Sequence, residues 1–147
     1  MSALRDRLSA EQVAARKAQD KPLTLLLGTI LSDIKNREIE LQRPVTDDDV
    51  IEVLQKGVKK RRESIPMYEQ GGRAELAEQE KAEVAALTRF LPAAATEDDI
   101  RTAVRATIAA GAIGVGPVMG KVMAQFKGRA EGGTINRIVR EELGKSE

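Results

Sequence analysis

Apolar residues recur at intervals of three and four along almost the whole chain, which is the spacing of one face of an α-helix. Proline, glycine and capping residues divide this pattern into seven predicted helices. Segments that alternate between polar and apolar residues are too short to predict a strand. The predicted fold is therefore all-α, with a four-helix N-terminal part, residues 1–92, and a small three-helix C-terminal bundle, residues 96–147.

The helix that follows Asp20-Lys21-Pro22 has the most apolar sequence of the seven, so we expect it to be central. Pro44 is predicted to close this helix. Leu25 and Leu31 are expected to widen its buried face. The centre of that face is predicted to be Leu23, Leu26, Leu27, Ile30, Ile34 and Leu41.

Two of the predicted helices begin with the same capping chemistry. Thr46 precedes three aspartates, and Thr96 precedes Glu97-Asp98-Asp99. In this pattern the hydroxyl accepts a hydrogen bond from a free backbone N–H, and the acidic residues favour the positive end of the helix dipole. The helix that starts after Thr46 is expected to kink or end at Pro66.

One carboxylate falls on an apolar face. Glu80 lies between Leu76 and Val84 on the predicted inner stripe of the fourth helix, which follows the turn at Gly71-Gly72. Because a buried charge is costly unless it is compensated, we expect Glu80 either to lie at the edge of the stripe or to pair with a cation from a neighbouring helix.

Residues 116–143 contain five glycines and five basic residues around two short apolar patterns. In the first pattern, Pro117 is expected at the first helical position and Gly128 at the stop. Its apolar face is predicted to be Met119, Val122, Met123 and Phe126. The second pattern is predicted to start just after Gly132-Gly133 and to end at Gly144, with an apolar face of Ile135, Ile138, Val139 and Leu143.

Two further glycines fall inside predicted helices. Gly120 is expected to permit a close approach of two helices, because it has no Cβ atom. Gly57 is expected either to do the same or to be a weak point of the third helix near a run of basic residues.

The composition excludes much of enzyme chemistry. The chain has no histidine and no cysteine, so serine triads of the usual kind, thiol nucleophiles and imidazole or thiolate metal sites are excluded. The many carboxylates lie at helix starts and on exposed faces, and no acid/base pair stands out. We expect no catalytic residue, no metal and no cofactor. No segment has the roughly 18 consecutive apolar residues of a membrane span, and a cytoplasmic location without a membrane partner is expected.

The net charge of +1 does not indicate a strongly basic nucleic-acid binder. The chain has 16 basic and 16 acidic residues before Pro92, then 8 basic and 7 acidic residues after it. Any nucleic-acid contact must therefore rest on local patches.

The densest of these patches is the run Lys59-Lys60-Arg61-Arg62, preceded by Lys56. It has two interpretations, a phosphate-contacting patch and a solvated helix face balanced by nearby glutamates, and residue types alone favour the second. Arg61 falls on the apolar side of its helix, so its stem is expected to pack while the guanidinium reaches outward or toward a carboxylate.

The second candidate is the loop from Lys127 to Gly133, which includes Arg129. Glycine backbone, two cations and the free N–H groups of the following helix are the ingredients of an anion site. A plain turn between helices is the alternative. Lys121, Arg137 and Arg140 are expected to extend this patch along the two flanking helices.

This segment also carries a family resemblance. The pattern G-x-V-M-G-K-V-M-x-x-F-K-G-R-A-x-G-G-x-x-N-R-I-V-R-E-E-L resembles the signature of the YqeY family, whose domain also forms the tail of the B subunit of the glutamine-dependent tRNA amidotransferase. Lys56 to Tyr68 (KGVKKRRESIPMY) and Glu80 to Pro92 (EKAEVAALTRFLP) are similar to the first half of that family. The resemblance covers nearly the whole chain.

The resemblance implies a non-catalytic module that binds or associates with tRNA. In the amidotransferase, the ATP- and glutamine-dependent reaction takes place elsewhere in the complex, although a carbon-nitrogen ligase label extends to the family by similarity. The implied partners are tRNA and an aminoacyl-tRNA synthetase or amidotransferase complex. The alternative is a protein-interaction adaptor that docks on a translation-related enzyme without binding RNA.

Overall fold

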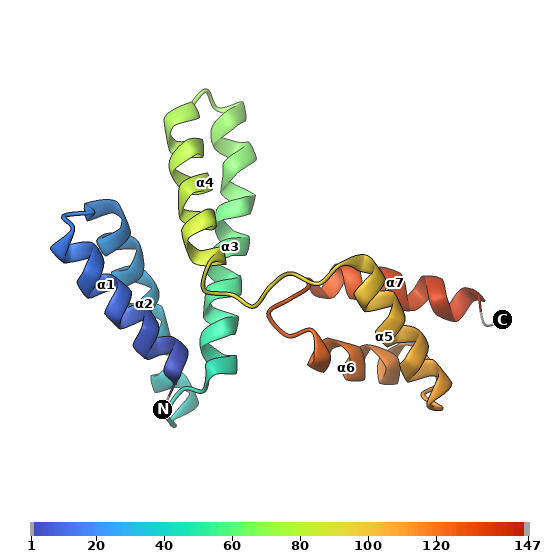
Figure 1. Ribbon diagram of the computed structural model, residues 1–147. Helices are drawn as coiled ribbons and strands as arrows, with labels where there is room; N and C mark the ends of the chain where they lie inside the picture. The colour runs from blue at the N-terminus through green and yellow to red at the C-terminus, as the bar shows by residue number, and fades with distance from the viewer. Residues whose placement is uncertain (1, 146–147) are drawn as a thin grey trace. The chain divides into compact units, whose positions relative to one another are not determined.

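The structure is a computed structural model that describes residues 2–145 (Figure 1). These residues form seven helices and no strand, so the all-α prediction is confirmed. The helices are α1 (Ala3–Lys17), α2 (Lys21–Leu41), α3 (Asp47–Gln70), α4 (Ala74–Thr88), α5 (Glu97–Ala109), α6 (Val115–Gln125) and α7 (Gly132–Lys145). The chain divides into two compact units, Met1–Leu91 with α1 to α4 and Pro92–Glu147 with α5 to α7.

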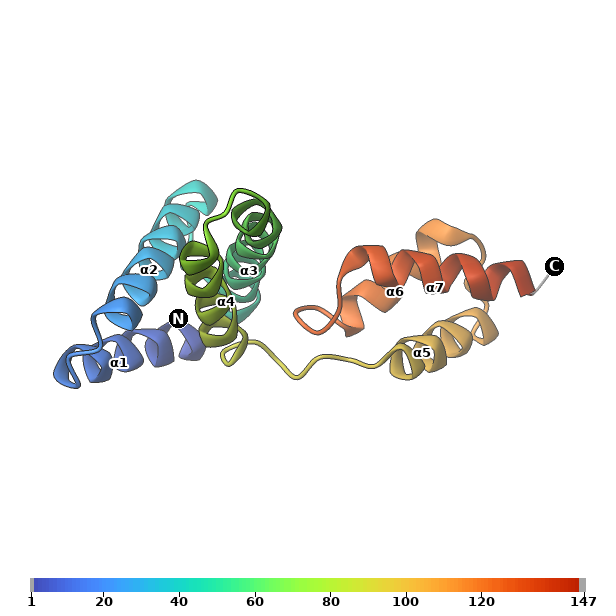
Figure 2. The ribbon, with the colours of Figure 1, turned by 90° about the horizontal axis from the view of Figure 1, so that it is seen from above.

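The first unit consists of two helical hairpins, α1–α2 and α3–α4, which Figures 1 and 2 show from two directions. As its apolar stripe predicts, α2 packs against the other three helices, and α3 does the same. The core between them is aliphatic. Its completely buried side chains are Leu8, Leu27, Ile30, Ile34, Val50, Leu54 and Leu87.

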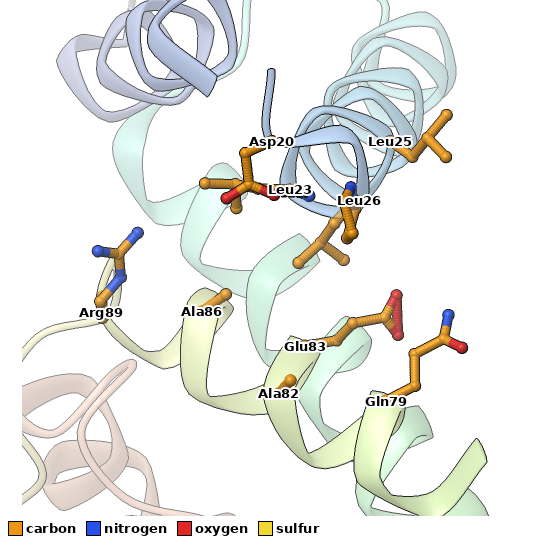
Figure 3. Close-up of a pocket in the computed structure, with 10 residues that line it drawn as sticks. Asp20, Leu23, Leu25, Leu26, Gln79, Ala82, Glu83, Ala86 and Arg89 are labelled. Atoms are coloured by element: carbon orange, nitrogen blue, oxygen red, sulfur yellow. Dashed lines mark hydrogen bonds between the residues drawn. The ribbon is translucent and has the colours of Figure 1, made fainter. Parts of the chain in front are cut away.

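Leu25 corrects the predicted buried face of α2. Its side chain is 73% exposed, whereas those of Leu26 and Leu27 are buried. The helix has neighbours around only part of its circumference, and the Leu25 side chain points away from α4 (Figure 3). Helical periodicity predicts which residues share a face, but it does not predict how wide the covered part of that face is.

Pro66 does not end α3, which continues to Gln70. A proline removes one backbone hydrogen bond and crowds the carbonyl four residues earlier. Here Pro66 is exposed and lies in the last turns of a 24-residue helix whose core contacts lie closer to its start, at Val50, Leu54 and Val58. Those contacts hold the first half of α3, so the cost of Pro66 falls near the end of the helix, away from them.

Gly57 permits a close approach of helices, which is one of the two roles that its sequence position left open. A Cβ atom at this position would lie 3.3 Å from Ile30 Cδ1 of α2, 3.3 Å from Arg61 Nη1 and 3.5 Å from Leu87 Cδ1 of α4. The three helices therefore meet at this glycine, and a side chain would force its neighbours to move.

The second unit packs α5, α6 and α7 around a separate aliphatic core. The predicted apolar face of α7 is confirmed, although α7 includes Gly132, Gly133 and Gly144 instead of lying between them. α6 begins at Val115, so Pro117 is its third residue, where the missing N–H still costs nothing. The buried residues of this core are Ile100, Val104, Val118, Val122, Phe126, Ile135, Ile138 and Val139.

Two predictions for α6 are wrong. Met123 is 44% exposed, and Val118, which was not on the predicted stripe, is completely buried, because α6 turns the line Val118, Val122 and Phe126 toward its neighbours. Gly120 is exposed, and a Cβ atom there would meet nothing within 4 Å. Among the described residues, no helix approaches closely at Gly120.

Candidate nucleic-acid interface

The basic run of α3 separates into residues that face solvent and one that does not. Lys56, Lys59, Lys60 and Arg62 are exposed. Within residues 2–145, the ammonium groups of the three lysines have neither a hydrogen-bond partner nor a carboxylate within 4 Å. Lys56 and Lys60 lie one turn apart on the same side of the helix, so three unneutralised cations lie within about 6 Å along its axis.

Arg61 points into the protein. Its Nε atom lies 3.4 Å from Glu83 Oε2 and 4.0 Å from Glu80 Oε2, both on α4, and its Nη1 donates to the Gly57 carbonyl at 3.0 Å. The side chain is only 15% exposed. The sequence left open whether the guanidinium reaches outward or toward a carboxylate, and it points toward the carboxylates of Glu80 and Glu83. The side chain therefore joins α3 to α4.

Glu80 pairs with a cation from a neighbouring helix, Arg61 of α3. This is one of the two arrangements that its place on the apolar stripe predicted. Its Oε2 atom is buried and accepts no hydrogen bond from any described residue, so the ion pair with Arg61 at 4.0 Å compensates its charge. A buried carboxylate oxygen without a donor is costly, and the arginine opposite reduces that cost.

In the C-terminal unit, Arg129 makes structural contacts. Its Nε donates to the Ala93 carbonyl at 3.0 Å, and its guanidinium carbon lies 5.4 Å from the centre of the Phe126 ring. The Arg129 carbonyl in turn accepts from the Ala95 N–H at 2.8 Å. These contacts attach the segment before α5 to the loop between α6 and α7, where Gly128 takes the predicted positive φ of 79°.

Arg137 and Arg140 also have partners within their unit. Arg137 pairs with Glu97 at 2.7 Å and with Glu141 at 2.9 Å, and these hydrogen bonds raise the pKa of its guanidinium. Arg140 Nε donates to Asn136 Oδ1 at 2.9 Å on the same helix. Lys121 and Lys127 are exposed on α6 and in the loop that follows it.

The sequence did not predict the charge cluster around buried Glu142. Glu142 of α7 is buried and accepts from Arg101 Nη1 at 2.7 Å and from Arg105 Nε at 3.0 Å, both on α5. These two arginines, Arg105 first, together with Lys145, lower the pKa of Glu142 to about 2. One signal was present: Glu142 lies seven residues after Ile135 and four after Ile138, on the apolar face of its helix.

The structure therefore brings the candidate residues to two separate places, one in each unit. The α3 patch, defined here as Lys56, Lys59 and Lys60, has unneutralised positive charge. In the C-terminal unit, Arg129, Arg137 and Arg140 are held by a carbonyl, by carboxylates and by an amide oxygen. Neither place has a group of three acidic residues that could hold a metal ion, within the part of the chain that the structure describes.

A family model described as Yqey-like protein matches residues 5–143. The chain belongs to the YqeY family. The match includes all seven helices almost completely and every candidate basic residue, so both patches lie within the segment that the family model matches.

Two fungal relatives match over long segments. The first, from Schizosaccharomyces pombe and named "Uncharacterized protein C22F3.15", is 34% identical over 76 residues, which are 52% of this chain and 62% of that protein. The second, from Pyrenophora tritici-repentis and named "Altered inheritance of mitochondria protein 41, mitochondrial", is 29% identical over 129 residues, or 84% of this chain and 71% of that protein. The match to the first relative thus covers less than two thirds of its length.

The described helices differ from a transmembrane helix in length or in composition. None of the seven combines the length and the apolar composition that crossing a bilayer requires.

Proposed function

We propose that this YqeY chain is a non-catalytic module that binds tRNA or associates with it, and that the α3 patch makes the principal phosphate contacts. The observation that supports this proposal is the absence of carboxylate partners around Lys56, Lys59 and Lys60 among the described residues. An exposed cation without a partner attracts phosphate at no cost in broken ion pairs.

The C-terminal unit contributes a second, smaller set of contacts through Lys121 and Lys127. Both are exposed and lie on the segment that resembles the amidotransferase tail. Arg129 and Arg137 act as positioning residues in this proposal, because their guanidinium groups hold the loop and join α5 to α7.

Amide transfer is not part of the proposed activity. The chain has no histidine or cysteine. The carboxylates whose pKa is lowered, Glu142 and Glu141 among them, owe that shift to arginines, hydroxyl groups and backbone N–H groups in ion pairs and helix caps. A complex with an amidotransferase or an aminoacyl-tRNA synthetase would supply the catalytic groups. ATP- and glutamine-dependent amidation of an acylated tRNA by the chain alone would contradict this part of the proposal.

The test is a titration of the full chain with tRNA and with an unrelated RNA duplex at several salt concentrations. We expect tighter binding to tRNA and an affinity that falls as salt rises. The double variant Lys56→Gln/Lys60→Gln should lose affinity by on the order of tenfold at about 0.1 M salt and reduce the salt slope by about 2.

Two other double variants distinguish the α3 patch from a general effect of charge and from the C-terminal unit. Lys17→Gln/Lys35→Gln removes the same charge from exposed lysines of α1 and α2 and should change the affinity little. Lys121→Gln/Lys127→Gln measures the share of the C-terminal unit. If tRNA binds no better than the duplex, or if the α1/α2 control loses as much affinity as the α3 variant, the proposal is wrong.

The location of the protein in the cell is also part of this proposal. We propose the cytoplasm, whereas the Pyrenophora relative has a mitochondrial name. Localisation of the tagged chain in its source cell distinguishes the two.

A further inference from the structure

A groove opens between α2 and α4 in the N-terminal unit, on helices other than the one that carries the α3 patch (Figure 3). Its volume is about 320 Å³. Leu23 and Leu26 line it from α2, and Ala82 and Ala86 line it from α4. These small side chains on α4 leave space in which the surface of another helix can approach closely.

Leu25 stands at the rim of this groove with 73% of its surface exposed. It is one of the most exposed large apolar side chains of the described chain. An exposed leucine next to an apolar groove provides an apolar contact that no described residue of the N-terminal unit covers.

The charged residues along the groove differ in their hydrogen-bond and ion-pair partners. Asp20 accepts a hydrogen bond from the Leu23 N–H, and Glu83 accepts one from Arg61. Arg89, which directly follows α4, has no carboxylate partner within 4 Å among the described residues. A backbone N–H does not neutralise a carboxylate, so Asp20 keeps its negative charge, and the positive charge of Arg89 is the one that an acidic residue of a partner can match.

A second arginine strengthens that positive end. The guanidinium carbons of Arg7 and Arg89 lie 4.8 Å and 5.6 Å from the centre of the same Phe90 ring. Arg7 is exposed and, within residues 2–145, also has no carboxylate partner. Stacking on the aromatic ring orders both guanidinium groups and leaves their N–H donors available.

The lining residues set the length of an occupant. Gln79, Ala82, Ala86 and Arg89 follow one another along one face of α4 and its C-cap, and the eleven residues from the first to the last span about 15 Å. This length corresponds to about three turns of a docked helix, whose apolar residues would recur at i, i+3 or i+4, and i+7.

We propose that the α2/α4 groove binds an amphipathic helix of a partner protein, with apolar residues against Leu23, Leu26, Ala82 and Ala86 and an acidic residue at Arg89 and Arg7. The match between the unpartnered arginines and an acidic residue sets the direction of the helix in the groove. This protein-binding site is independent of the proposed RNA contacts on α3.

The test begins with a displayed library of helical peptides with one randomised face, selected on the full chain and counter-selected on the variant Ala82→Arg. Ala82 is exposed and arginine is a good helix former, so the variant should fold while its side chain fills the groove. Ala85→Arg is the matched control, because Ala85 is exposed on the same helix but outside the groove. Circular dichroism and thermal melting verify that both variants fold alike.

We expect the enriched peptides to have apolar residues at helical spacing followed by Asp or Glu. Their affinity should fall by about tenfold or more in Ala82→Arg and remain within about twofold in Ala85→Arg. Arg89→Glu should weaken these peptides and tighten peptides in which Lys replaces the acidic residue.

Three outcomes would overturn the inference: no enrichment beyond the counter-selecting variant, enriched peptides that bind Ala82→Arg as well as the unmodified chain, or no response to the charge exchange at Arg89. A fourth is specific to RNA. If Ala82→Arg weakens tRNA binding while no peptide is enriched, the groove is an RNA contact and not a site for a protein helix.

Discussion

Arg101 of α5 donates to Glu142 of α7 over 2.7 Å, and the carboxylate that it reaches is buried. Arg105 lies one turn further along α5 and binds the same carboxylate at 3.0 Å. Two arginines on one helix therefore hold one carboxylate on another. This arrangement joins the first and last helices of the C-terminal unit by charge as well as by apolar packing.

The Glu142 cluster should make the stability of this unit depend on pH. Because the pKa of Glu142 is lowered from its ordinary 4.5 to about 2 in the folded chain, its contribution is complete above pH 4.5 and is lost as the pH falls toward 2. Glu142→Gln should lower the melting temperature at pH 7, and the gap to the unmodified chain should narrow as the pH falls below about 4.5.

Glu141→Gln is the control for that experiment, because Glu141 binds Arg101 and Arg137 but is exposed. Its effect at pH 7 should be smaller than that of Glu142→Gln, since exposed ion pairs contribute little. A gap between the Glu142→Gln variant and the unmodified chain that stays constant from pH 7 to pH 3 would contradict the assignment.

Gly57 and Gly120 are expected to respond oppositely to the same substitution. Gly120→Ala adds a methyl group into open space within a helix and should stabilise the chain by up to about 1 kcal/mol. Gly57→Ala gains the same helix propensity but places its Cβ atom 3.3 Å from Ile30 Cδ1. Chemical denaturation should show a gain at Gly120 and none at Gly57; an equal gain at both would show that the three helices can move apart freely.

Arg61 should matter for stability and its neighbour Lys60 should not. Arg61→Gln removes the cation opposite Glu80 and Glu83 and leaves a buried carboxylate oxygen uncompensated, so we expect a loss of about 1–3 kcal/mol in the free energy of unfolding. Lys60→Gln changes an exposed side chain without an ion pair and should stay within about 0.5 kcal/mol. Urea unfolding of both variants measures the difference, and similar losses would be inconsistent with it.

The two threonine caps provide a further comparison. Thr46 and Thr96 each form a capping box with an aspartate three residues later, but only Asp49 is buried and also bonded by Arg43, at 2.7 Å. Thr46→Ala and Thr96→Ala should each cost about 1 kcal/mol, with the larger loss at Thr46. Thermal melting of the two single variants tests the order, and a larger loss at Thr96 would reverse it.

Most local features were predictable because they depend on neighbours in the sequence. The caps at Thr46 and Thr96, the positive φ at Gly128 and the buried stripe of α7 each follow from residues within two turns of a helix. The predictions that fail concern surfaces. Leu25, Met123 and Gly120 lie on or near the expected apolar faces, yet no other helix covers them.

The candidate patches show the same division. Residue types predicted which side chains are basic, and the spacing placed Arg61 on the inner side of α3. Whether a cation has a carboxylate opposite it depends on residues far away in the sequence, such as Glu83 for Arg61 or Glu97 for Arg137. The groove of α2 and α4 has no signal in either helix alone, because it exists only where two hairpins diverge.

The sequence by itself determined that the chain is helical, where the capped helices α3 and α5 begin and which family it resembles, because capping, periodicity and motifs are local properties. Tertiary structure alone decided which charges are neutralised, which apolar residues stay exposed and where Gly57 brings three helices together. These depend on distances between helices, which are set by the packing of whole side chains and not by any short segment.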